Sequence, residues 1–462
     1  MGADWLGTAV DVVARETLLL AAVGFLVGGI DDLVVDAIFF ARLIRRRLRG
    51  RAELVLETLP PPSRPIALFV PCWREAAVIG AMLRHALGAW PHRELRIYVG
   101  VYPNDRATVD AVAAVAENDD RVRLVIGAQP GPTTKGDNLN ALWAALLADE
   151  VVGQPSVAAI VLHDAEDVVH PGELAVYDLL IGAFDAVQLP VLPIADARSR
   201  FVGGTYLDEF AESHAKALIV RQAVGAAVPF AGVGCAISRM MLENIARHRG
   251  GAPFDASSLT EDYELGLTVA MLGGQVAAPR VYERATGQPV AVRAYFPDRL
   301  IPAVRQKARW MVGIAFAGWD RLGWQGSRTW VDRWMRMRDR RQPLAVLLLA
   351  IAYLAVLLVG AATVRGWLGG RHLDFLDGWL AIALQVNFAL LFWRLALRAG
   401  FTGLAYGPWQ AMLSLLRFPV GNVIAMIAAV RAVGDYVAML RGGRLRWDKT
   451  AHRFPDDPAG AL

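Results

Sequence analysis

Long apolar stretches at the two ends of this chain constrain its fold more than any other feature. Residues 344–364 and 379–396 approach the roughly 20 apolar residues that a helix needs to cross a bilayer. Residues 18–30 are also strongly apolar, and we expect a span near residues 12–32. Hydrophobic residues make up 55% of the chain, which is above the usual share of a soluble domain. The sequence therefore predicts a membrane protein with several helical spans.

Three carboxylates set the expected end of the first span. Continuing the helix through Asp31, Asp32 and Asp36 would place these side chains in lipid, at a cost of about 2.5–3.5 kcal/mol each. We therefore expect the span to stop near residue 32 and an interfacial helix to follow over residues 40–51. Residues 1–51 are thus predicted to form an N-terminal transmembrane anchor with an interfacial helix.

The last apolar segment, residues 409–440, is interrupted by Arg417, Pro419, Arg431 and Asp435. Arg431 and Asp435 are four residues apart and could pair on one helix face. A full fourth span would carry the basic tail across the membrane, against the tendency of Lys and Arg to stay in the cytoplasm. We therefore expect an interfacial or re-entrant segment, in a C-terminal membrane region at 326–440 that precedes a basic cytosolic tail at 441–462.

Charge and cysteine content indicate where the rest of the chain lies. Basic residues cluster at 42–51, 333–341 and 441–453, each beside an apolar run, as in the cytoplasmic flanks of membrane spans. Solvated faces of ordinary helices would look similar. Cys72 and Cys235 lack disulfide or metal spacing, which suits a reduced compartment. We expect a multi-pass protein of the bacterial inner membrane with its middle region in the cytosol; the net charge of +4 requires no nucleic-acid partner.

Residues 65–300 follow a different pattern, in which short apolar runs alternate with helix-length segments. The apolar runs are 66–70, 97–101, 122–126 and 158–162, and the helix-length segments include 76–89 and 138–147. This alternation predicts a mostly parallel, Rossmann-like sheet covered by helices. Polar clusters follow the predicted strands at 72–75, 104–105 and 163–167. Since ligands of such sheets bind beyond the carboxyl ends of the strands, these clusters mark the expected site.

The acidic run at 163–167, directly after a predicted strand, is the first candidate for chemistry. Carboxylates two residues apart at a strand end can hold one divalent cation, which in turn binds a diphosphate. Hard oxygen ligands suit Mg²⁺ or Mn²⁺. An acidic turn that caps the following helix would have the same composition. The residues leave open whether Glu166 or Asp167 is the second ligand beside Asp164.

Two helical patterns downstream carry further candidates. A threonine precedes Glu261 and Asp262, which is typical of a helix N-terminus but also suits a general base that takes a proton from an acceptor hydroxyl. Gln306, Arg309 and Trp310 share one helix face, where a guanidinium suits a diphosphate and an indole suits a sugar ring. A basic amphipathic helix on a membrane surface would have the same face.

A glycine loop and a lysine complete the candidates. Phe230, Gly232 and Gly234 lie between apolar flanks, where glycines permit close approach of the backbone to a ligand, although simple turns use glycines as often. Lys135 lies just before an apolar helix, and a lysine at a helix N-terminus favours phosphate binding. The glycine spacing around Lys135 excludes a Walker loop.

The order and spacing of these patterns resemble the family 2 inverting glycosyltransferases with the GT-A fold, especially the membrane-embedded cellulose and hyaluronan synthase type. The matching segments, over residues 65–320, are 69–75, 135–140, 164–166, 230–234, 260–262 and Gln306-x-x-Arg309-Trp310. Within the family, the segments that resemble the bacteriophage adsorption protein B type are 102–105, 163–167 and 305–310. The resemblance implies a cytosolic α/β GT-A domain at 52–325 together with α-helical transmembrane segments.

The resemblance also implies a role for each candidate. Asp262 would be the catalytic base, with Glu261 beside it. The implied ligands of Mg²⁺ or Mn²⁺ are Asp164, Glu166 and Asp167. The implied donor-binding residues are Glu75, Asp105, Lys135, Asp164, Gln306 and Arg309. The implied acceptor-binding residues are Phe230, Gly232 and Trp310.

The implied activity is an inverting, metal-dependent transfer of sugar from a nucleotide donor, with UDP as the expected nucleotide. It would extend a β-linked exopolysaccharide at the inner membrane and couple synthesis to translocation. The acceptor would be a growing glycan or a lipid, and the further partners would be membrane lipids and an outer-membrane export protein. The alternatives are a single transfer to a membrane lipid carrier and an inactive scaffold or phage-receptor component.

Overall fold

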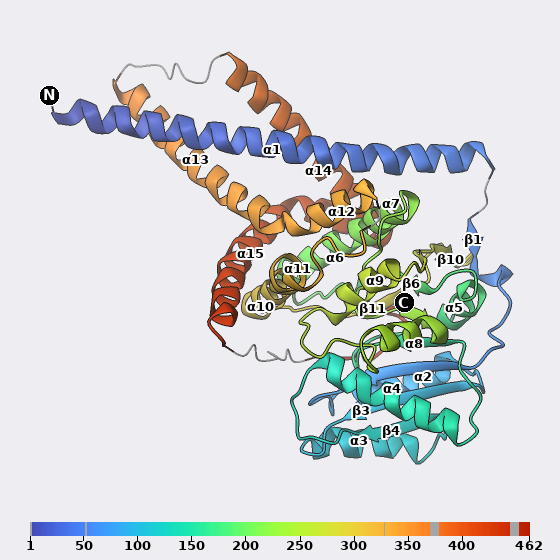
Figure 1. Ribbon diagram of the computed structural model, residues 1–462. Coiled ribbons are helices and arrows are strands. Elements are labelled where there is room, and N and C mark those ends of the chain that lie inside the picture. The colour runs from blue at the N-terminus through green and yellow to red at the C-terminus, as the bar shows by residue number, and fades with distance from the viewer. Residues whose placement is uncertain (1, 51–52, 328, 370–377, 444–451) are drawn as a thin grey trace.

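The computed structural model describes residues 2–50, 53–327, 329–369, 378–443 and 452–462. The middle of the chain forms an α/β domain, and long helices from both ends of the chain gather on one side of it (Figure 1). Two predicted segments are described only in part, because Arg51 of the interfacial helix and residues 444–451 of the basic tail lie outside the described residues.

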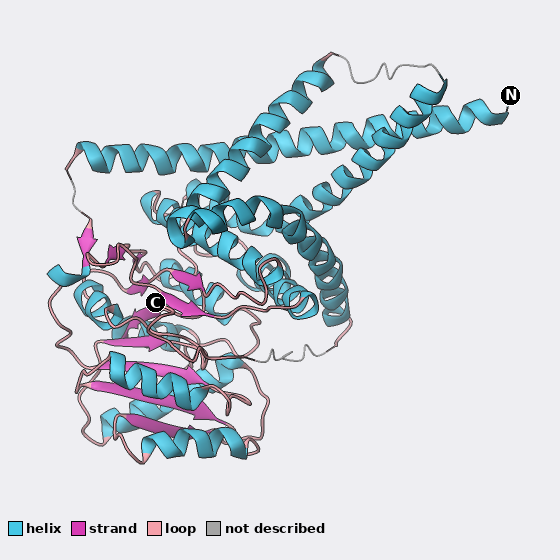
Figure 2. Ribbon diagram, turned by 180° about the vertical axis from the view of Figure 1, so that it is seen from behind, coloured by secondary structure: helices cyan, strands magenta, loops and turns pink. Residues whose placement is uncertain are grey.

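A seven-stranded sheet forms the centre of the domain (Figure 2). Its order is β4 (Val122–Ile126), β3 (Leu95–Val101), β2 (Ile66–Pro71), β5 (Ala159–Leu162), β8 (Cys235–Ser238), β6 (Ala186–Gln188) and β9 (Val276–Ala277). All neighbours are parallel except β8, which is antiparallel to both β5 and β6. Two small parallel pairs flank the sheet, β1 (Leu54–Val55) with β10 (Val281–Tyr282) and β7 (Val191–Pro193) with β11 (Val292–Ala294). The predicted mostly parallel sheet is therefore confirmed.

Alternate residues of the central strands enter two separate cores. Ile66, Leu68 and Val70 of β2 pack on one face of the sheet, whereas Ala67 and Phe69 pack on the other. The first core includes α2 (Ile79–Ala89), α3 (Arg106–Ala116) and α5 (Glu173–Leu180). The second includes α4 (Lys135–Val151), α8 (Arg239–His248) and α9 (Glu261–Met271). Because helices cover both faces, the strands read in the sequence as continuous apolar runs.

Parallel pairing of β2 with both β3 and β5 brings the carboxyl ends of three strands to one edge of the sheet. Pro71, Val101 and Leu162 end these strands. The polar clusters expected to form the site begin within a few residues of each end, so the register of the sheet gathers them at that edge.

Among the residues that the structure describes, four helices are long and apolar enough to cross a membrane. They are α1 (Gly2–Leu48), α13 (Gln342–Gly369), α14 (Trp379–Tyr406) and α15 (Pro408–Leu440). Helix α1 packs along α13 and α14, and α14 packs along α15. The first helix has 47 residues and is therefore about 70 Å long, more than twice the roughly 30 Å of a bilayer's apolar core.

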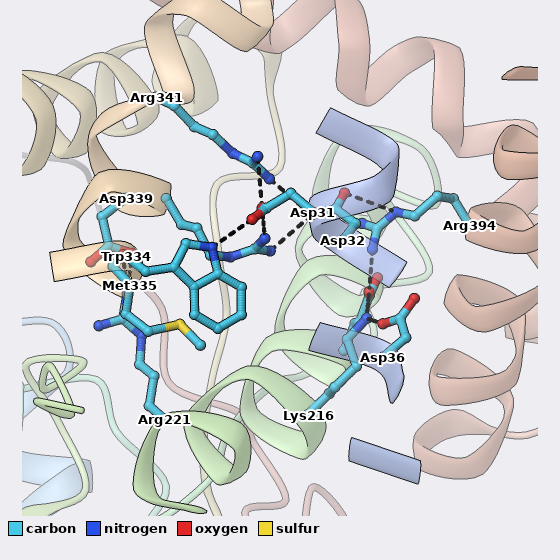
Figure 3. A network of polar contacts seen from close by, with 12 residues as sticks. Asp31, Asp32, Asp36, Lys216, Arg221, Trp334, Met335, Asp339, Arg341 and Arg394 are labelled. Atoms are coloured by element: carbon cyan, nitrogen blue, oxygen red, sulfur yellow. Dashed lines mark hydrogen bonds and ion pairs between the residues drawn. The ribbon is translucent and has the colours of Figure 1, made fainter. Parts of the chain in front are cut away.

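Helix α1 runs without interruption through the three acids near which the span is predicted to end, and the carboxylates of these acids have cationic partners (Figure 3). Asp31 lies 2.7 Å from the guanidinium of Arg341 and accepts a hydrogen bond from Trp334 Nε1 at 2.5 Å. Asp36 lies 2.5 Å from Lys216 Nζ. Paired carboxylates are far cheaper to remove from water than isolated ones, so the helix continues to Leu48. The interfacial position of its second half stays a prediction.

Helix α15 likewise continues through the residues expected to interrupt it. Arg417 is fully buried and binds both carboxylate oxygens of Asp208, at 2.6 and 2.9 Å. Arg431 and Asp435 pair at 3.4 Å, which confirms the predicted contact. The segment is therefore an unbroken helix with neutralised charges, and its predicted interfacial or re-entrant position stays a prediction.

Shorter helices join the α/β domain to the long ones. They are α6 (Val202–Glu212), α7 (Leu218–Ala223), α10 (Leu300–Met311), α11 (Ala317–Leu322) and α12 (Trp330–Arg340), with a 3₁₀ turn, η1 (Leu56–Thr58), and two π-helical turns, η2 (Ser213–Ala217) and η3 (Val312–Phe316). An apolar cluster formed by α6, α10, η3 and α15 lies between the two parts. The helix that carries Arg309 and Trp310 therefore rests directly on α15.

Candidate active site

Three predicted motifs meet at the carboxyl edge of the sheet around Lys135. Thr134 caps the start of α4 by accepting a hydrogen bond from the amide of Asp137 at 3.2 Å, which fixes the position of the next residue. Lys135 Nζ lies 2.6 Å from Asp164 Oδ1 and 3.8 Å from Glu261 Oε1. The lysine therefore joins the acidic turn after β5 to the start of α9.

The charges of this cluster shift one another's protonation. Although burial opposes its charge, Asp164, Glu261 and Asp262 raise the pKa of Lys135, so the ammonium stays protonated. Burial raises the pKa of Glu261 to about 7 and also raises that of Asp262, while Lys135 lowers both. A carboxyl whose pKa is raised by burial is a better proton acceptor, which suits the general base proposed at Asp262.

Gly232 lies against the carboxylate of Asp262. Its φ of 83° is a conformation that favours glycine, and a Cβ at this position would lie 2.6 Å from Asp262 Oδ2. Its carbonyl oxygen also accepts a hydrogen bond from Lys135 Nζ at 3.5 Å. The backbone approach expected for the glycine loop is therefore made to a catalytic candidate. Phe230, by contrast, is 4% exposed within the second core, and this burial argues against its predicted contact with an acceptor.

The structure separates the two candidates for the second metal ligand. Asp167 is 2% exposed, and its Oδ2 accepts a hydrogen bond from the amide of Asp164 and contacts His163 Nδ1, both at 2.9 Å. Its carboxylate is therefore used inside the turn. Glu166 instead faces His452, with its Oε2 3.1 Å from the imidazole Nδ1. Glu166 remains the candidate ligand beside Asp164.

Glu75 and Asp105 lie at the ends of β2 and β3 and are held by backbone contacts. The amide of Arg74, whose φ is 56°, donates to Asp105 Oδ2 at 2.5 Å. The amide of Glu75 donates to Thr108 Oγ1 at 3.0 Å. These contacts join the two strand ends predicted to bind the nucleotide. An adjoining hollow of about 290 Å³ lies beyond β3 and β4 and is lined in part by Tyr102.

Gln306, Arg309 and Trp310 lie on α10, as predicted for one helix face. Gln306 Oε1 and Arg309 Nε are buried and have no hydrogen-bond partner within the part of the chain that the structure describes. Buried polar atoms without partners are uncommon and are often ligand-facing. The positive charge of Arg309 also lowers the pKa of Asp262, which places the guanidinium near that carboxylate. Trp310 packs against Tyr206, with ring centroids 6.1 Å apart.

The tail that follows α15 also reaches the candidate site, which the sequence reasoning missed. His452 Nδ1 lies 3.0 Å from Glu75 Oε1 and 3.1 Å from Glu166 Oε2. Burial alone would lower the pKa of His452, but Glu166 and Glu75 raise it to about 10, so the imidazole is cationic. Nothing in the basic composition of the tail marks this contact; Phe454, which packs on the first core, is an apolar signal nearby.

The next residue of the tail makes a second contact with the domain. The guanidinium of Arg453 lies 2.8 Å from Asp196 and 3.8 Å from the centroid of the Tyr295 ring. His452, Arg453 and Phe454 thus form three consecutive contacts to the catalytic part of the chain.

With this geometry established, comparison with known proteins gives the family. Residues 61–313, more than half of the chain, match the family model described as glycosyltransferase like family 2. The chain belongs to this family. The predicted family resemblance and the predicted transferase activity are both confirmed, and the protein is a glycosyltransferase.

Curated relatives and a solved structure agree with this assignment. Bacteriophage adsorption protein B of Escherichia coli (strain K12) and bacteriophage N4 adsorption protein B of Escherichia coli O157:H7 are each 35% identical to this glycosyltransferase over 482 residues. The alignments cover 98% of the chain but only 64% of each relative. A mannosyltransferase from Pyrobaculum calidifontis has a TM-score of 0.53 at 18% identity, over 92% of this chain and 99% of its own, a likeness that shows the fold alone. The predicted GT-A fold is confirmed.

Proposed function

We propose that this glycosyltransferase transfers a sugar from a nucleotide-sugar donor, with UDP as the nucleotide, to an acceptor hydroxyl with inversion at the anomeric carbon. The observation that carries the proposal is the convergence of Lys135, Asp164 and Asp262 at one edge of the sheet. A protonated amine there suits a diphosphate, one carboxylate suits a metal ion, and the other suits proton abstraction. Three side chains whose chemistry suits one reaction thus lie within a single cluster.

Asp164 and Glu166 fit a divalent cation. Each already faces a positive side chain, Lys135 at 2.6 Å and His452 at 3.1 Å, so both carboxylates lie where positive charge is stabilised, and a bound ion would compete with these side chains. Such hard ligands suit Mg²⁺ or Mn²⁺, and the solved mannosyltransferase was in complex with GDP-Man and Mn²⁺. When bound, the ion would neutralise charge on the diphosphate as the sugar leaves.

The remaining steps belong to side chains of the protein. Asp262 would take the proton of the acceptor hydroxyl, whose oxygen forms the new bond to the anomeric carbon while the bond to the diphosphate breaks. Arg309 and Lys135 would stabilise the negative charge of the leaving diphosphate. The buried Oε1 of Gln306 would accept a hydrogen bond from a hydroxyl of the bound sugar. Trp310 would support the acceptor sugar from α10.

Glu75 and Asp105, at neighbouring strand ends, would contact the nucleoside part of the donor. Their carboxylates suit ribose hydroxyls, which are hydrogen-bond donors. The hollow beyond β3 and β4 would be available for the base. His452 is a further candidate for the donor side of the site, because it links Glu75 to Glu166.

We further propose that the enzyme lies in the bacterial inner membrane with this domain in the cytosol and extends a β-linked exopolysaccharide. Four apolar helices supply contact with membrane lipids, and the basic clusters favour the cytosolic side. Helix α10, which carries Trp310, packs on α15, so the growing glycan would leave the site beside the long helices. An outer-membrane export partner would receive it.

A single transfer to a membrane lipid carrier is the competing activity, and an inactive phage-receptor component is the non-enzymatic alternative. The length of the products formed from labelled donor distinguishes a single transfer to a lipid carrier from polymer synthesis. Only products with one added sugar would reject processivity.

The test of the proposed reaction is the release of nucleoside diphosphate by purified protein in nanodiscs, across a panel of nucleotide sugars with and without Mn²⁺. Asp262→Asn should abolish release, and Asp110→Asn, on the exposed face of α3, should not. Metal-dependent release from one UDP-sugar would support the proposal. Release that persists in Asp262→Asn, or no release from any donor by folded protein, would reject it.

A further inference from the structure

A buried row of three ionisable side chains lies directly behind the acidic turn. His163 Nδ1 contacts Asp167 Oδ2 at 2.9 Å, and His163 Nε2 contacts Glu173 Oε2 at 3.0 Å. The exposed fractions of the three side chains are 0%, 2% and 0%. None of them has a role in the proposed reaction, yet the row begins one residue before Asp164.

The far end of the row is anchored in α5. Glu173 lies in the first turn of this helix and accepts hydrogen bonds from the amide of His170 at 2.6 Å and from Tyr177 Oη at 3.2 Å. Trp90 packs on the imidazole of His163, with ring centroids 5.9 Å apart. The orientation of the imidazole is therefore set by a helix and an indole rather than by solvent.

The near end of the row fixes the backbone of the acidic turn. The Oδ2 atom of Asp167 that contacts His163 is the same atom that accepts the hydrogen bond from the amide of Asp164. If His163 turned away, this oxygen would be free to rotate and the amide of Asp164 would lose its acceptor. The carboxylate of Asp164 follows its own backbone, so the row controls where that carboxylate points.

Stability alone does not account for this arrangement. Replacing a buried ionic group by well-packed apolar residues is often neutral or stabilising, so such a group is weak evidence for a stabilising role. Fully satisfied buried networks instead give one defined geometry. A defined geometry is what a metal ligand needs, and partners that orient a ligand typically change metal affinity by about 10- to 100-fold when they are removed.

We propose that His163 and Glu173 are positioning residues for the metal site of this glycosyltransferase. They hold Asp167, and through it the backbone of Asp164, in the orientation that binds the cation. The inference rests on the proposed function, in which Asp164 and Glu166 are the ligands. It also assigns Asp167 to the support of the turn rather than to the metal.

Two nearly isosteric substitutions of His163 test which of its two contacts, with Asp167 or with Glu173, matters for Mn²⁺ binding. In His163→Asn the amide nitrogen takes the place of Nδ1 and can still donate to Asp167, whereas in His163→Gln it takes the place of Nε2 and can donate only to Glu173. Mn²⁺ affinity in the presence of UDP is measured by the electron paramagnetic resonance signal of free Mn²⁺. We expect His163→Gln to weaken Mn²⁺ binding by about tenfold or more and His163→Asn by less than about threefold.

Kinetics separate positioning from a general loss of structure. In His163→Gln, the Mn²⁺ concentration for half-maximal rate should rise while the rate at saturating Mn²⁺ recovers most of the wild-type value. Glu173→Gln should also raise the Mn²⁺ concentration for half-maximal rate. His92→Gln, whose wild-type imidazole contacts the carbonyl oxygen of Arg64 at 2.9 Å away from the site, should change neither quantity.

The inference would be overturned if His163→Gln bound Mn²⁺ as tightly as wild type. It would also be overturned if His163→Asn and His163→Gln weakened Mn²⁺ binding equally and lost equal thermal stability. Asp164→Asn distinguishes this failure from failure of the proposed function. If wild type and Asp164→Asn bind Mn²⁺ alike, the metal assignment itself is wrong.

Discussion

Lys216 should be more important for stability than either carboxylate that it contacts. Its ammonium lies between two elements, 2.5 Å from Asp36 of α1 and 2.7 Å from Glu212 of α6, and the side chain is 5% exposed (Figure 3). At an effective dielectric constant of about 20, each contact corresponds to an attraction of roughly 6 kcal/mol, most of which is offset by the desolvation of the charges. Lys216→Met removes both attractions and leaves two buried carboxylates near one another.

The expected cost of Lys216→Met is about 3–5 kcal/mol, the usual result of removing one partner of a buried ion pair. Asp36→Asn should cost less, because the amide oxygen can take the place of Oδ1 and still accept from Lys216. The contact of Oδ2 with Trp393 Nε1, at 2.9 Å, would then be lost, because the amide NH2 cannot accept a hydrogen bond. The double substitution should be more stable than Lys216→Met alone, since Glu212 keeps its contact with Arg394 at 3.1 Å and Asp36 no longer carries a charge.

Thermal unfolding in detergent, followed by tryptophan fluorescence, measures these differences. For a cooperative unit of about 250 residues, each kcal/mol moves the midpoint by about 2 °C, so Lys216→Met should lower it by roughly 6–10 °C. Arg106→Met, which breaks an exposed pair with Asp110, should lower it by less than about 2 °C. If the double variant lost the sum of the stabilities that Lys216→Met and Asp36→Asn lose separately, the two side chains would be independent and the reasoning would be refuted.

Three further predictions concern the active site. Gly232→Ala should reduce nucleotide release by roughly 100-fold or more with unchanged circular dichroism, because the added Cβ would lie 2.6 Å from Asp262 Oδ2; near-normal release would contradict the described contact. Burial raises the pKa of Asp262, the proposed base, so kcat/KM should begin to fall at a higher pH than an ordinary aspartate would give, by about tenfold per pH unit; a profile that stays flat down to the ordinary aspartate pKa of about 4 would contradict this base. His452→Ala removes a cation from Glu166 and should tighten Mn²⁺ binding by roughly three- to tenfold in titrations; weaker binding would show that the imidazole supports the metal instead.

Much of the catalytic domain was predictable because its signals are local. The apolar runs at 66–70, 97–101 and 122–126 coincide with strands, since strands buried on both faces leave continuous apolar runs in a sequence. Parallel pairing then requires the polar residues after each strand to share an edge. The meeting of Lys135 with Asp164 follows from that topology.

Other features depend on contacts between distant segments and have no local signal. The sequence shows the cost of three acids in α1, but the cations that neutralise them lie 180 or more residues away in the chain. The choice between Glu166 and Asp167 required the position of His163 relative to the amide of Asp164. Phe230 lies beside the candidate glycines Gly232 and Gly234 in the sequence, yet its side chain packs in the core.

The contact of His452 with Glu75 and Glu166 gives the enzyme a built-in order of assembly. A ribosome makes the sheet and its catalytic side chains first, and N-terminal domains generally fold first during synthesis. The imidazole that links the two carboxylates emerges only after α13, α14 and α15 have been made. An enzyme whose last helices are misplaced would hold His452 away from Glu75. The link that His452 makes between Glu75 and Glu166 therefore forms only after the last long helix has been made, and a domain that ends before α13 would lack it.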